Sequence, residues 1–463
     1  MPAGDEQPSG RVTTPIWVRS RSVPSVSVGE AIDALEPVDA VWTGPGETSL
    51  VAGGVTERIG GTNERIGGVT ERIVGSGPGR FRDVKREAIG LFDRLRSSDV
   101  PEVARPRLMG GFSFFDAEDL DPPWESFPPA MFVLPKWQLA FAEEDTWLTV
   151  TRANAKEAER MIESAVDRLD AIRTEDERQN VPGPGVNGNR PRVDEATWRN
   201  HVGEIVESIE NGRLEKAVLA QALEVSLVRP FDLRPEFEAL RDTYPDCYTF
   251  AFVPDASRNE RTAEVFFGAS PERLVSKTDD VVKTDAIAGT VPRGEDDTSD
   301  EKLSTVLQTD PKIHEEHGVV VDHIRDRLAS VATGVSITDR EVRTLENVQH
   351  LQSVLSATID PATHVLDVLE RLHPTPAVGG VPPPVAMDVI DRREPLDRGW
   401  YAAPIGWFDA EGNGTFAVGI RSALASGTDA TLFAGNGIVR DSDPEAEFEE
   451  VQLKFRPILD HLQ

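Results

Sequence analysis

The sequence predicts an α+β fold built on large antiparallel β-sheets. In the C-terminal part, strand patterns follow one another directly: "EVFFGASPERLVSK" (residues 264–277) has the pattern of strand, turn and strand, and "YAAPIGWFD" (401–409), "GTFAVGIRSALAS" (414–426) and "ATLFAGNGIV" (430–439) come in series. A parallel sheet needs a long crossover, usually a helix, between its strands. Strands that adjoin in sequence therefore favour antiparallel sheets, with helices set apart from them.

The N-terminal part shows the same mixture of elements. Strand patterns cover residues 106–119 and 130–153, and a helix is predicted over 155–173, where Met161, Ala165 and Leu169 are in phase. The following stretch, "TEDERQNVPGPGVNGNRPRV", is rich in Pro, Gly and Asn and is typical of a linker. We therefore divide the chain into an N-terminal α+β subdomain, 1–190, and a C-terminal part, 191–463, which carries the motifs described below.

A repeat of three units with a period of seven residues interrupts the N-terminal subdomain. "VTERIGG", "TNERIGG" and "VTERIVG" occupy residues 55–75, and paired glycines in two of the three units oppose a coiled coil. We expect a duplicated loop insertion, with a short hairpin as the alternative, and we assign the repeat no chemistry.

The remaining elements of the C-terminal part alternate between helix and strand. An amphipathic helix over 194–214 leads into a strand over 215–228, and a strand over 279–294 ends in a Gly/Pro loop. Further helices are predicted over 310–330 and from Pro444 onwards, the second with Asp443 as its N-cap.

The charge balance narrows the range of partners. Of the 463 residues, 80 are acidic and 49 basic, which gives a formal net charge of −31. Such a surface repels nucleic acid and anionic membranes, so an anionic substrate must be attracted locally, by Arg, Lys, a metal ion or a helix N-terminus. Strong acidity with Arg in place of Lys is typical of a salt-adapted, halophilic protein.

Cysteine content and hydropathy bear on location. Cys247 is the single cysteine, so an intrachain disulfide is impossible. The N-terminal residues carry no apolar signal core, and the sequence lacks a run of about 18 apolar residues. We expect a cytoplasmic protein.

Lys216 begins the strand "EKAVLAQ" and shares a face with Val218 and Ala220. One interpretation is a lysine at the sheet edge whose amine reaches water. The other is a desolvated lysine that acts as a general base. This segment alone leaves both interpretations open.

Glu272 follows Pro271 in the turn of "GASPERL", where Gly268 and Ala269 leave room beside it. A glutamate in such a turn commonly forms a surface ion pair. In a cleft, its carboxyl group would stay protonated and serve as a general acid.

Two helices carry carboxylates beside their apolar faces. In the helix 310–330, Val320, Ile324 and Leu328 define the buried face, with Glu316 on its border and Glu315 towards solvent. In the closing helix, side chains at spacing i, i+3, i+7 follow the edge of the apolar stripe: Glu447, Glu450 and Lys454. Acids near the start of that helix also complement its dipole. Carboxylates from separate helices would suit Mg²⁺ held together with a substrate anion.

Glycines and one arginine complete the candidates. "AGT" at 288–290, "VGG" at 378–380 and "AGNG" at 434–437 offer backbone N–H groups at close range. Arg421 lies near the centre of a predicted strand, where it would pair with a structural carboxylate or grip a substrate carboxylate.

Taken in order, these motifs resemble the chorismate-utilising enzymes, which include isochorismate synthases, salicylate synthases and the large subunits of anthranilate and aminodeoxychorismate synthases. The resemblance runs from about residue 200 to the end of the chain, through "EKAVLAQ", "GASPERLV", "AIAGTVPRG", "EEHGVVVDHI", "NVQHLQS", "LHPTPAVGG", "DRGWYAAPIGWFD", "FAVGIRSAL" and "AGNGIVRDSDPEAEFEEVQLK". It extends more loosely into "PRLMGGFSF" and "WESFPPAMFVLPKW". It implies antiparallel sheets packed face to face with helices outside.

The resemblance also implies roles. Lys216 would be the base that activates water, and Glu272 the acid that protonates the departing hydroxyl of chorismate. Glu316 and Glu450 would hold Mg²⁺ on the ring carboxylate, with Glu447 close by. Arg421 and Tyr401 would clamp the enolpyruvyl carboxylate, and the rest of the site would be lined by Gly289, Thr290, His350, Gly435, Gly437 and Lys454.

Within this family, the sequence favours isochorismate synthase. The amide-using synthases differ from this chain at Lys216, and the aminodeoxychorismate type also resembles "KGT" where this chain has "AGT". Water is therefore the expected nucleophile, and an amidotransferase partner is not expected. We expect the enzyme to act in menaquinone biosynthesis. A salicylate synthase, which keeps the same base and acid and then eliminates pyruvate, is the alternative, followed by an anthranilate synthase subunit and a non-catalytic chorismate-binding protein.

One position departs from the family pattern. Family members often carry an acid three residues before the metal-binding glutamate, whereas this chain has Ile313. The helical phase places Ile313 on the buried face, so Glu315 does not substitute for that acid.

Overall fold

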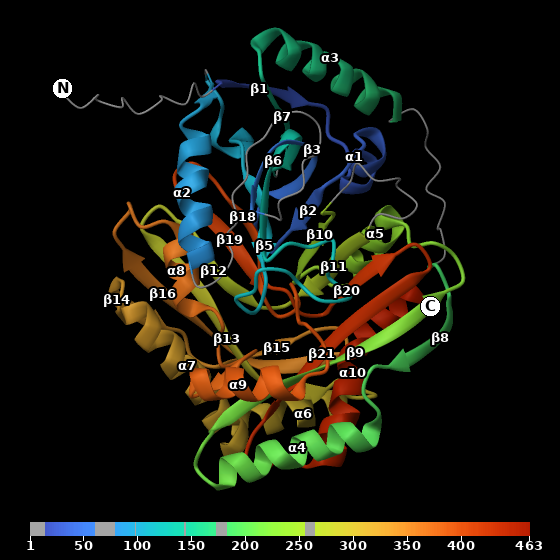
Figure 1. Cartoon of the computed structure of the whole chain (residues 1–463), viewed down its shortest axis with the longest axis vertical. Helices are drawn as coiled ribbons and strands as arrows, with labels where there is room; N and C mark the ends of the chain where they lie inside the picture. Colours follow the sequence, from blue (N-terminus) through green and yellow to red (C-terminus); the bar gives the residue numbers. More distant parts are fainter. Residues whose placement is uncertain (1–13, 61–78, 98, 143–144, 173–182, 255–263) are drawn as a thin grey trace, which may run out of the picture.

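The computed structural model describes residues 14–60, 79–97, 99–142, 145–172, 183–254 and 264–463. Its helices surround a strand network (Figure 1) and have these bounds: α1 Val28–Ala34, α2 Arg80–Phe92, α3 Ala155–Ile172, α4 Glu195–Glu210, α5 Leu233–Thr243, α6 Asp297–Thr309, α7 Pro311–Ala329, α8 Val365–Leu372, α9 Pro383–Arg393 and α10 Pro444–Leu462. In the described part of the chain, none of these helices is both long and apolar enough to cross a membrane.

Within the described residues, the strands form one network of 21 members, and every pairing except the parallel one between β1 and β4 is antiparallel. Their bounds are β1 Ile16–Val23, β2 Ala40–Thr43, β3 Ser49–Gly60, β4 Leu95–Arg96, β5 Leu108–Phe112, β6 Ala130–Phe141, β7 Thr146–Arg152, β8 Val186–Pro191, β9 Lys216–Leu227, β10 Tyr248–Phe252, β11 Glu264–Ser270, β12 Arg273–Thr278, β13 Val281–Pro292, β14 Ala332–Ile337, β15 Glu341–Thr344, β16 Val348–Ile359, β17 Gly380–Val381, β18 Pro404–Phe408, β19 Gly414–Val418, β20 Ser422–Ser426 and β21 Asp429–Ile438.

The pairings divide this network into two halves. The first half runs β9–β21–β20–β11–β10–β2–β3, with β8 and β17 on the outer edge of β9. The second runs β6–β5–β18–β19–β12–β13–β16, with β14 and β15 on the outer edge of β16. The pairing of β3 with β6 joins the halves, and β7, β1 and β4 continue the network from β6 in that order. The network therefore crosses residue 190, and the division of the chain at that position remains a prediction.

Side-chain alternation along the strands creates two cores. On β10 and β11, Phe250 and Phe266 face one core, whereas their neighbours Ala251 and Phe267 face the other. The first core lies between the two halves and contains large aromatic side chains, among them Trp42, Trp124, Phe132, Trp400 and Phe416. The second lies between the first half and helices α1, α4, α5 and α10, and it continues between helix α3 and strands β1 and β7. Sheets packed face to face with helices outside are the predicted architecture.

Two expectations about elements were wrong. The predicted linker contains β8, which pairs with β9 across a bulge between Val186 and Gly188. Its polar, Pro-containing sequence suits an edge strand, because one side of such a strand needs no partner. The second wrong expectation was that the whole repeat forms a loop. Strand β3 extends through the first unit of the repeat as far as Gly60. The rest of the repeat, 61–75, lies outside the described residues.

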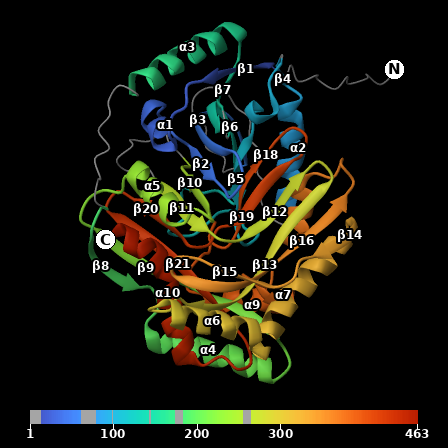
Figure 2. The ribbon, with the colours of Figure 1, turned by 180° about the vertical axis from the view of Figure 1, so that it is seen from behind.

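The helix predictions, which rested on apolar periodicity and on capping residues, agree with the structure. In α7, Val320, Ile324 and Leu328 are fully buried. Asp443 accepts hydrogen bonds from two backbone N–H groups at the start of α10, and Pro444 occupies the first turn. Figure 2 shows α7, α9, α10 and α4 gathered at the end of the molecule opposite α3.

Candidate active site

One cavity of about 360 Å³ brings together side chains that are far apart in the sequence. All the predicted site residues line it: Lys216, Glu272, Gly289, Thr290, Glu316, His350, Tyr401, Arg421, Gly435, Gly437, Glu447, Glu450 and Lys454. They come from both halves of the strand network and from helices α7 and α10.

Lys216 is the first residue of β9 and is only 4% exposed, so it does not extend along the sheet edge to water. Gly437 on the neighbouring strand β21 provides the necessary room, because a Cβ atom there would lie 2.6 Å from Cε of Lys216. The Nζ amine donates a hydrogen bond to Oε1 of Glu316 at 2.8 Å. Burial of the amine inside a cavity fits the general-base interpretation, whereas the ion pair with Glu316 favours the charged ammonium form, so this pair must open before Lys216 can accept a proton.

Glu272 lies in the turn between β11 and β12 and is also 4% exposed. Burial, helped by the negative charge of Asp285, raises the pKa of Glu272 to about 8, although Lys216 and Arg343 act in the opposite direction. A carboxyl group with this pKa is protonated at neutral pH. The surface ion-pair interpretation therefore does not apply, and Glu272 is able to donate a proton.

The carboxylates on the two helices occupy the positions that helical phase predicts. Glu316 is half-buried while Glu315 is exposed, and Glu447 and Glu450 are half-buried while Glu449 is exposed. Burial and the nearby charge of Glu450 raise the pKa of Glu447. The mutual repulsion of these carboxylates would be relieved by a cation, and their oxygen atoms are donors that Mg²⁺ accepts. In the part of the chain that the structure describes, no three metal-binding side chains are close enough to form a ready cluster.

Basic groups occupy another part of the wall. Lys454 donates from Nζ to the carbonyl oxygen of Gly435 at 3.0 Å and pairs with Glu450 at 2.7 Å. Arg421 donates from Nη1 to the carbonyl oxygen of Lys454 at 3.3 Å. Tyr401 is buried, and its ring stacks on Phe433 with the centroids 5.4 Å apart. Burial raises the pKa of Tyr401, so its hydroxyl stays protonated and can donate.

Thr290 and His350 face each other across β13 and β16, with Oγ1 of Thr290 3.1 Å from Nδ1 of His350. Burial lowers the pKa of His350 to about 3, so the imidazole is neutral at physiological pH. Its Nε2 atom is buried without a partner in the described structure. Gly289 adopts a φ of +69° at a bulge in the same ladder, and Ile313 packs where a Cβ atom of Gly289 would lie.

Glu272 and Arg421 lie on two connections that cross directly, from strand to strand, between the halves of the strand network. β11 continues into β12 through Glu272, and β19 continues into β20 through Arg421. The two crossings are hydrogen-bonded to each other: Val418 N donates to Glu272 O at 3.0 Å, and Ala269 N donates to Arg421 O at 3.1 Å. The site is thus built on the seam where the chain changes from one half to the other.

The structure corrects the expectation that Arg421 lies near the centre of one strand. The predicted strand 414–426 is broken into β19 and β20, and Arg421, in the break, adopts a φ of +51°. Gly268 makes this possible, since a Cβ atom there would lie 2.4 Å from the carbonyl oxygen of Arg421. A positive φ in a non-glycine residue is strained backbone of the kind that clusters at functional sites.

Sequence reasoning missed several groups that shape the site. Asp310, Ala377 and Phe433 also line the cavity. Behind its wall, Glu394 and Arg398 form a buried ion pair with Nη2 to Oε1 at 2.5 Å. Their i, i+4 spacing just before "GWYAAP" was a readable signal. The position of Arg343 beside the Glu272 turn carried no such signal, because the two segments are distant in sequence.

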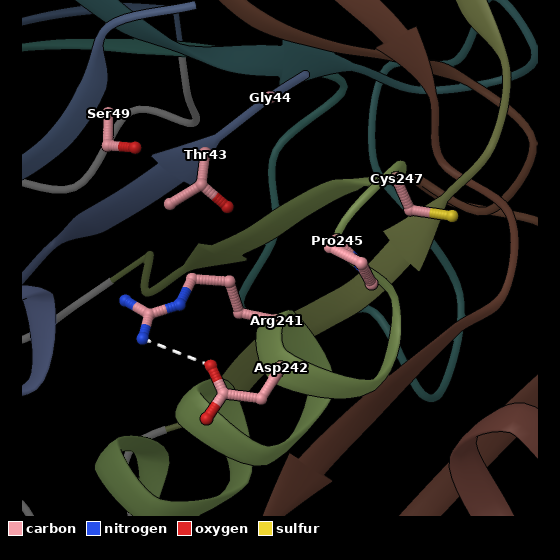
Figure 3. A pocket seen from close by; sticks show the side chains of 7 residues that line it. All are labelled: Thr43, Gly44, Ser49, Arg241, Asp242, Pro245 and Cys247. Carbon is pink, nitrogen blue, oxygen red and sulfur yellow. Dashed lines mark hydrogen bonds and ion pairs between the residues drawn. The ribbon is translucent and has the colours of Figure 1, made fainter. Parts of the chain in front are cut away.

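A second cavity, of about 430 Å³, contains none of the predicted residues (Figure 3). It is lined by Thr43, Gly44, Ser49, Arg241, Asp242, Pro245 and Cys247. Arg241 pairs there with the adjacent Asp242 at 3.2 Å. It shares no lining residue with the first cavity.

A family model described as "Chorismate binding enzyme" matches residues 64–463. The chain belongs to the chorismate-binding enzymes. Isochorismate synthase MenF of Bacillus subtilis (strain 168) is 34% identical over 395 residues, which cover 83% of this chain and 81% of the relative. The "salicylate biosynthesis isochorismate synthase" of Pseudomonas aeruginosa is 36% identical over 357 residues, 76% and 73% of the two chains.

Solved structures of chorismate-binding enzymes share the fold. The structure of MenF from Escherichia coli, described as the menaquinone-specific isochorismate synthase, covers 97% of this chain and 95% of its own, with a TM-score of 0.76 and 26% identity. Anthranilate synthase component I from Streptococcus pneumoniae has a TM-score of 0.73 at 22% identity, a likeness of fold alone. The predicted family and fold are therefore confirmed.

Proposed function

We propose that this chain is an isochorismate synthase, an isomerase that adds water at C2 of chorismate and releases the C4 hydroxyl. The observation that carries the proposal is the presence in one cavity of a buried lysine and a buried glutamate whose pKa is raised by burial to about 8. Lys216 removes a proton from the attacking water, and Glu272 gives its proton to the departing hydroxyl, which leaves as water. The atoms balance, because one water enters and one leaves.

The proposed binding mode uses the basic part of the wall. Chorismate is a dianion, and this chain with its net charge of −31 needs concentrated positive groups to hold it. Arg421 and Tyr401 grip the enolpyruvyl carboxylate, and Lys454 adds a positive charge nearby. Thr290 and His350 line the ring, together with the backbone at Gly289, Gly435 and Gly437.

Mg²⁺ is the proposed cofactor. Glu316 and Glu450 would hold it, with Glu447 close by, and the bound ion would neutralise the ring carboxylate of the substrate. Glu316 and Glu450 are paired with Lys216 and Lys454 respectively. Each lysine therefore keeps its glutamate at the edge of the cavity.

The proposed role is in menaquinone biosynthesis, the pathway named for the Escherichia coli structure. Salicylate synthesis is the second candidate, because the Pseudomonas aeruginosa relative is named for it and the same acid and base would serve. We place the enzyme in the cytoplasm, since its one cysteine allows no intrachain disulfide, and we propose that it acts without an amidotransferase partner.

Product analysis tests the proposal. The purified protein is incubated with chorismate and Mg²⁺, with and without ammonia, in salt up to the molar range, and the products are separated and identified. Isochorismate alone is expected, and Lys216→Gln should lower its rate of formation by about 10²- to 10⁴-fold. Salicylate with pyruvate would select the second candidate. Anthranilate formed only with ammonia would overturn both, and chorismate binding without turnover would indicate a non-catalytic protein.

A further inference from the structure

The carboxyl group of Glu272 lacks a hydrogen-bond partner among the described residues, so its position depends on the backbone that carries it. Three contacts fix that backbone. Glu272 N donates to Oγ of Ser270 at 3.3 Å, and Glu272 O accepts from Val418 N at 3.0 Å. The carbonyl oxygen of Pro271 accepts a bond of 2.6 Å from Nη1 of Arg343.

Arg343 reaches this turn from a different part of the fold. It belongs to the short strand β15 and lies directly opposite His350 on β16. Its second terminal nitrogen, Nη2, donates to the carbonyl oxygen of Asp246, just before β10. One guanidinium group thus ties the turn of Glu272 to two other segments. Arg343 does not line the cavity and cannot touch the substrate.

Arg343 also contributes charge. The charged groups that act on Glu272 are Asp285 on β13, Lys216 on β9 and Arg343 on β15. Asp285 is paired with Arg273 at 2.6 Å and raises the pKa of Glu272, whereas Lys216 and Arg343 lower it. Loss of the Arg343 charge would therefore raise the pKa of Glu272 further.

We infer that Arg343 is a positioning residue for Glu272: its guanidinium fixes the Pro271 carbonyl, and its charge keeps the acid able to give up its proton. The inference rests on the proposed function, because it assumes that Glu272 is the general acid. Because the carbonyl of Pro271 is held one residue before Glu272, Arg343 helps to set the direction of the Glu272 carboxyl group, which has no hydrogen bond of its own among the described residues. A displacement of about 1 Å at a reacting group can lower a rate by about 100-fold.

The pH dependence of kcat/KM for chorismate in two variants tests this inference. Arg343→Met removes both the bonds and the charge. Its kcat should fall about 10- to 100-fold with KM within about twofold, and the alkaline limb should move to higher pH. Arg343→Lys keeps the charge, so its alkaline limb should stay near that of the wild type and its kcat should be intermediate. Arg327, which donates to the Arg371 carbonyl away from the cavity, gives the matched control Arg327→Met with an unchanged profile.

A second measurement does not require turnover. The infrared band of the protonated Glu272 carboxyl group, isolated by subtracting the spectrum of Glu272→Gln, should persist to higher pH in Arg343→Met than in the wild type. An equal loss of rate at every pH, with the band unmoved, would overturn the inference and leave Arg343 a purely structural residue. Absence of isochorismate from the wild type would instead contradict the proposed function, and the band would still decide the role of Arg343.

Discussion

At the scale of single residues, the protonation of Glu272 is an effect of its surroundings. The carboxyl group has an ordinary value of 4.5, and its pKa in the folded protein is about 8. Below pH 4.5, both the folded and the unfolded chain hold the proton. As pH rises towards 8, only the folded chain still holds it, so increasing pH favours unfolding. The stability linked to this proton is present below pH 4.5 and is lost as pH rises through the folded pKa.

Glu272→Gln should remove this pH dependence. Gln is neutral at every pH, so the variant should lose less thermal stability than the wild type between about pH 5 and pH 9. Melting temperatures of the two proteins measured across this range provide the check. If the melting temperatures of the two proteins changed equally with pH over this range, Glu272 would be ionised in the folded protein.

The sequence predicted some residues of the site well and others only through the family resemblance. Glu316 could be distinguished from Glu315 because helical phase assigns a direction to each side chain. Burial of Glu272 could not be read in this way, since a turn has no period. The break at Arg421 was also invisible, because its cause, the missing side chain of Gly268, lies on another strand.

At the scale of elements, the outer edge of β9 has a gap in its hydrogen-bonding ladder. β17 pairs with Lys216 and Ala217, and β8 pairs only from Leu223 onwards. Between them, side chains replace a strand: Arg398 donates from Nη2 to Val218 O at 2.9 Å, and Ala220 N donates to Oε1 of Glu394 at 2.7 Å. This fully buried ion pair therefore holds the strand that carries Lys216.

Arg398→Met should destabilise the protein by about 3–5 kcal/mol, because it leaves the Glu394 carboxylate buried without its partner. Denaturant unfolding measures the change. Arg392→Met is the matched control: Arg392 pairs with Asp388 at the same i, i+4 spacing but on the surface, where a pair contributes about 0–1 kcal/mol. Equal effects of the two substitutions would contradict a supporting role for the buried pair.

Neighbouring carboxylates on helix α10 lie in different surroundings. Glu450 lines the cavity, whereas its neighbour Glu449 is exposed. If Glu450 holds Mg²⁺, Glu450→Gln should raise the Mg²⁺ concentration needed for half-maximal activity by at least about tenfold, the scale of losing even an outer-sphere partner of a metal ligand. Calorimetric titration with Mg²⁺ gives a readout independent of turnover. Glu449→Gln should behave like the wild type, and an unaltered Mg²⁺ affinity in Glu450→Gln would exclude it as a ligand.

Elements were predictable where a local pattern was strong. The apolar periods of α4, α7 and α10 and the N-cap of α10 were read correctly, because these signals are local to each helix. β8 was missed because an edge strand takes its partner from β9 and its own polar sequence has no alternation. The spacing of Glu394 and Arg398 was readable, but their bridge to β9 was not, since it depends on tertiary contact.

At the scale of the whole molecule, the net charge of −31 creates self-repulsion that opposes folding. Salt shortens the reach of this repulsion, from about 10 Å at 0.1 M to about 3 Å at 1 M. The melting temperature should therefore rise when KCl is raised from about 0.1 M to about 1 M. Sucrose at the same osmolality as the KCl is the control, because it is excluded from the protein surface but does not screen charge. A melting temperature that is constant or falls with KCl would contradict salt adaptation.

The two crossings between the halves of the strand network have a consequence for how the family can vary. Glu272 and Arg421 lie on connections that are hydrogen-bonded to each other, so the proposed proton donor and the proposed carboxylate grip form one connected unit. Sliding of one half over the other would displace both together. A change of nucleophile or product is therefore expected to come from single side chains beside this unit, such as Ala288 or Ile313, with its geometry left intact.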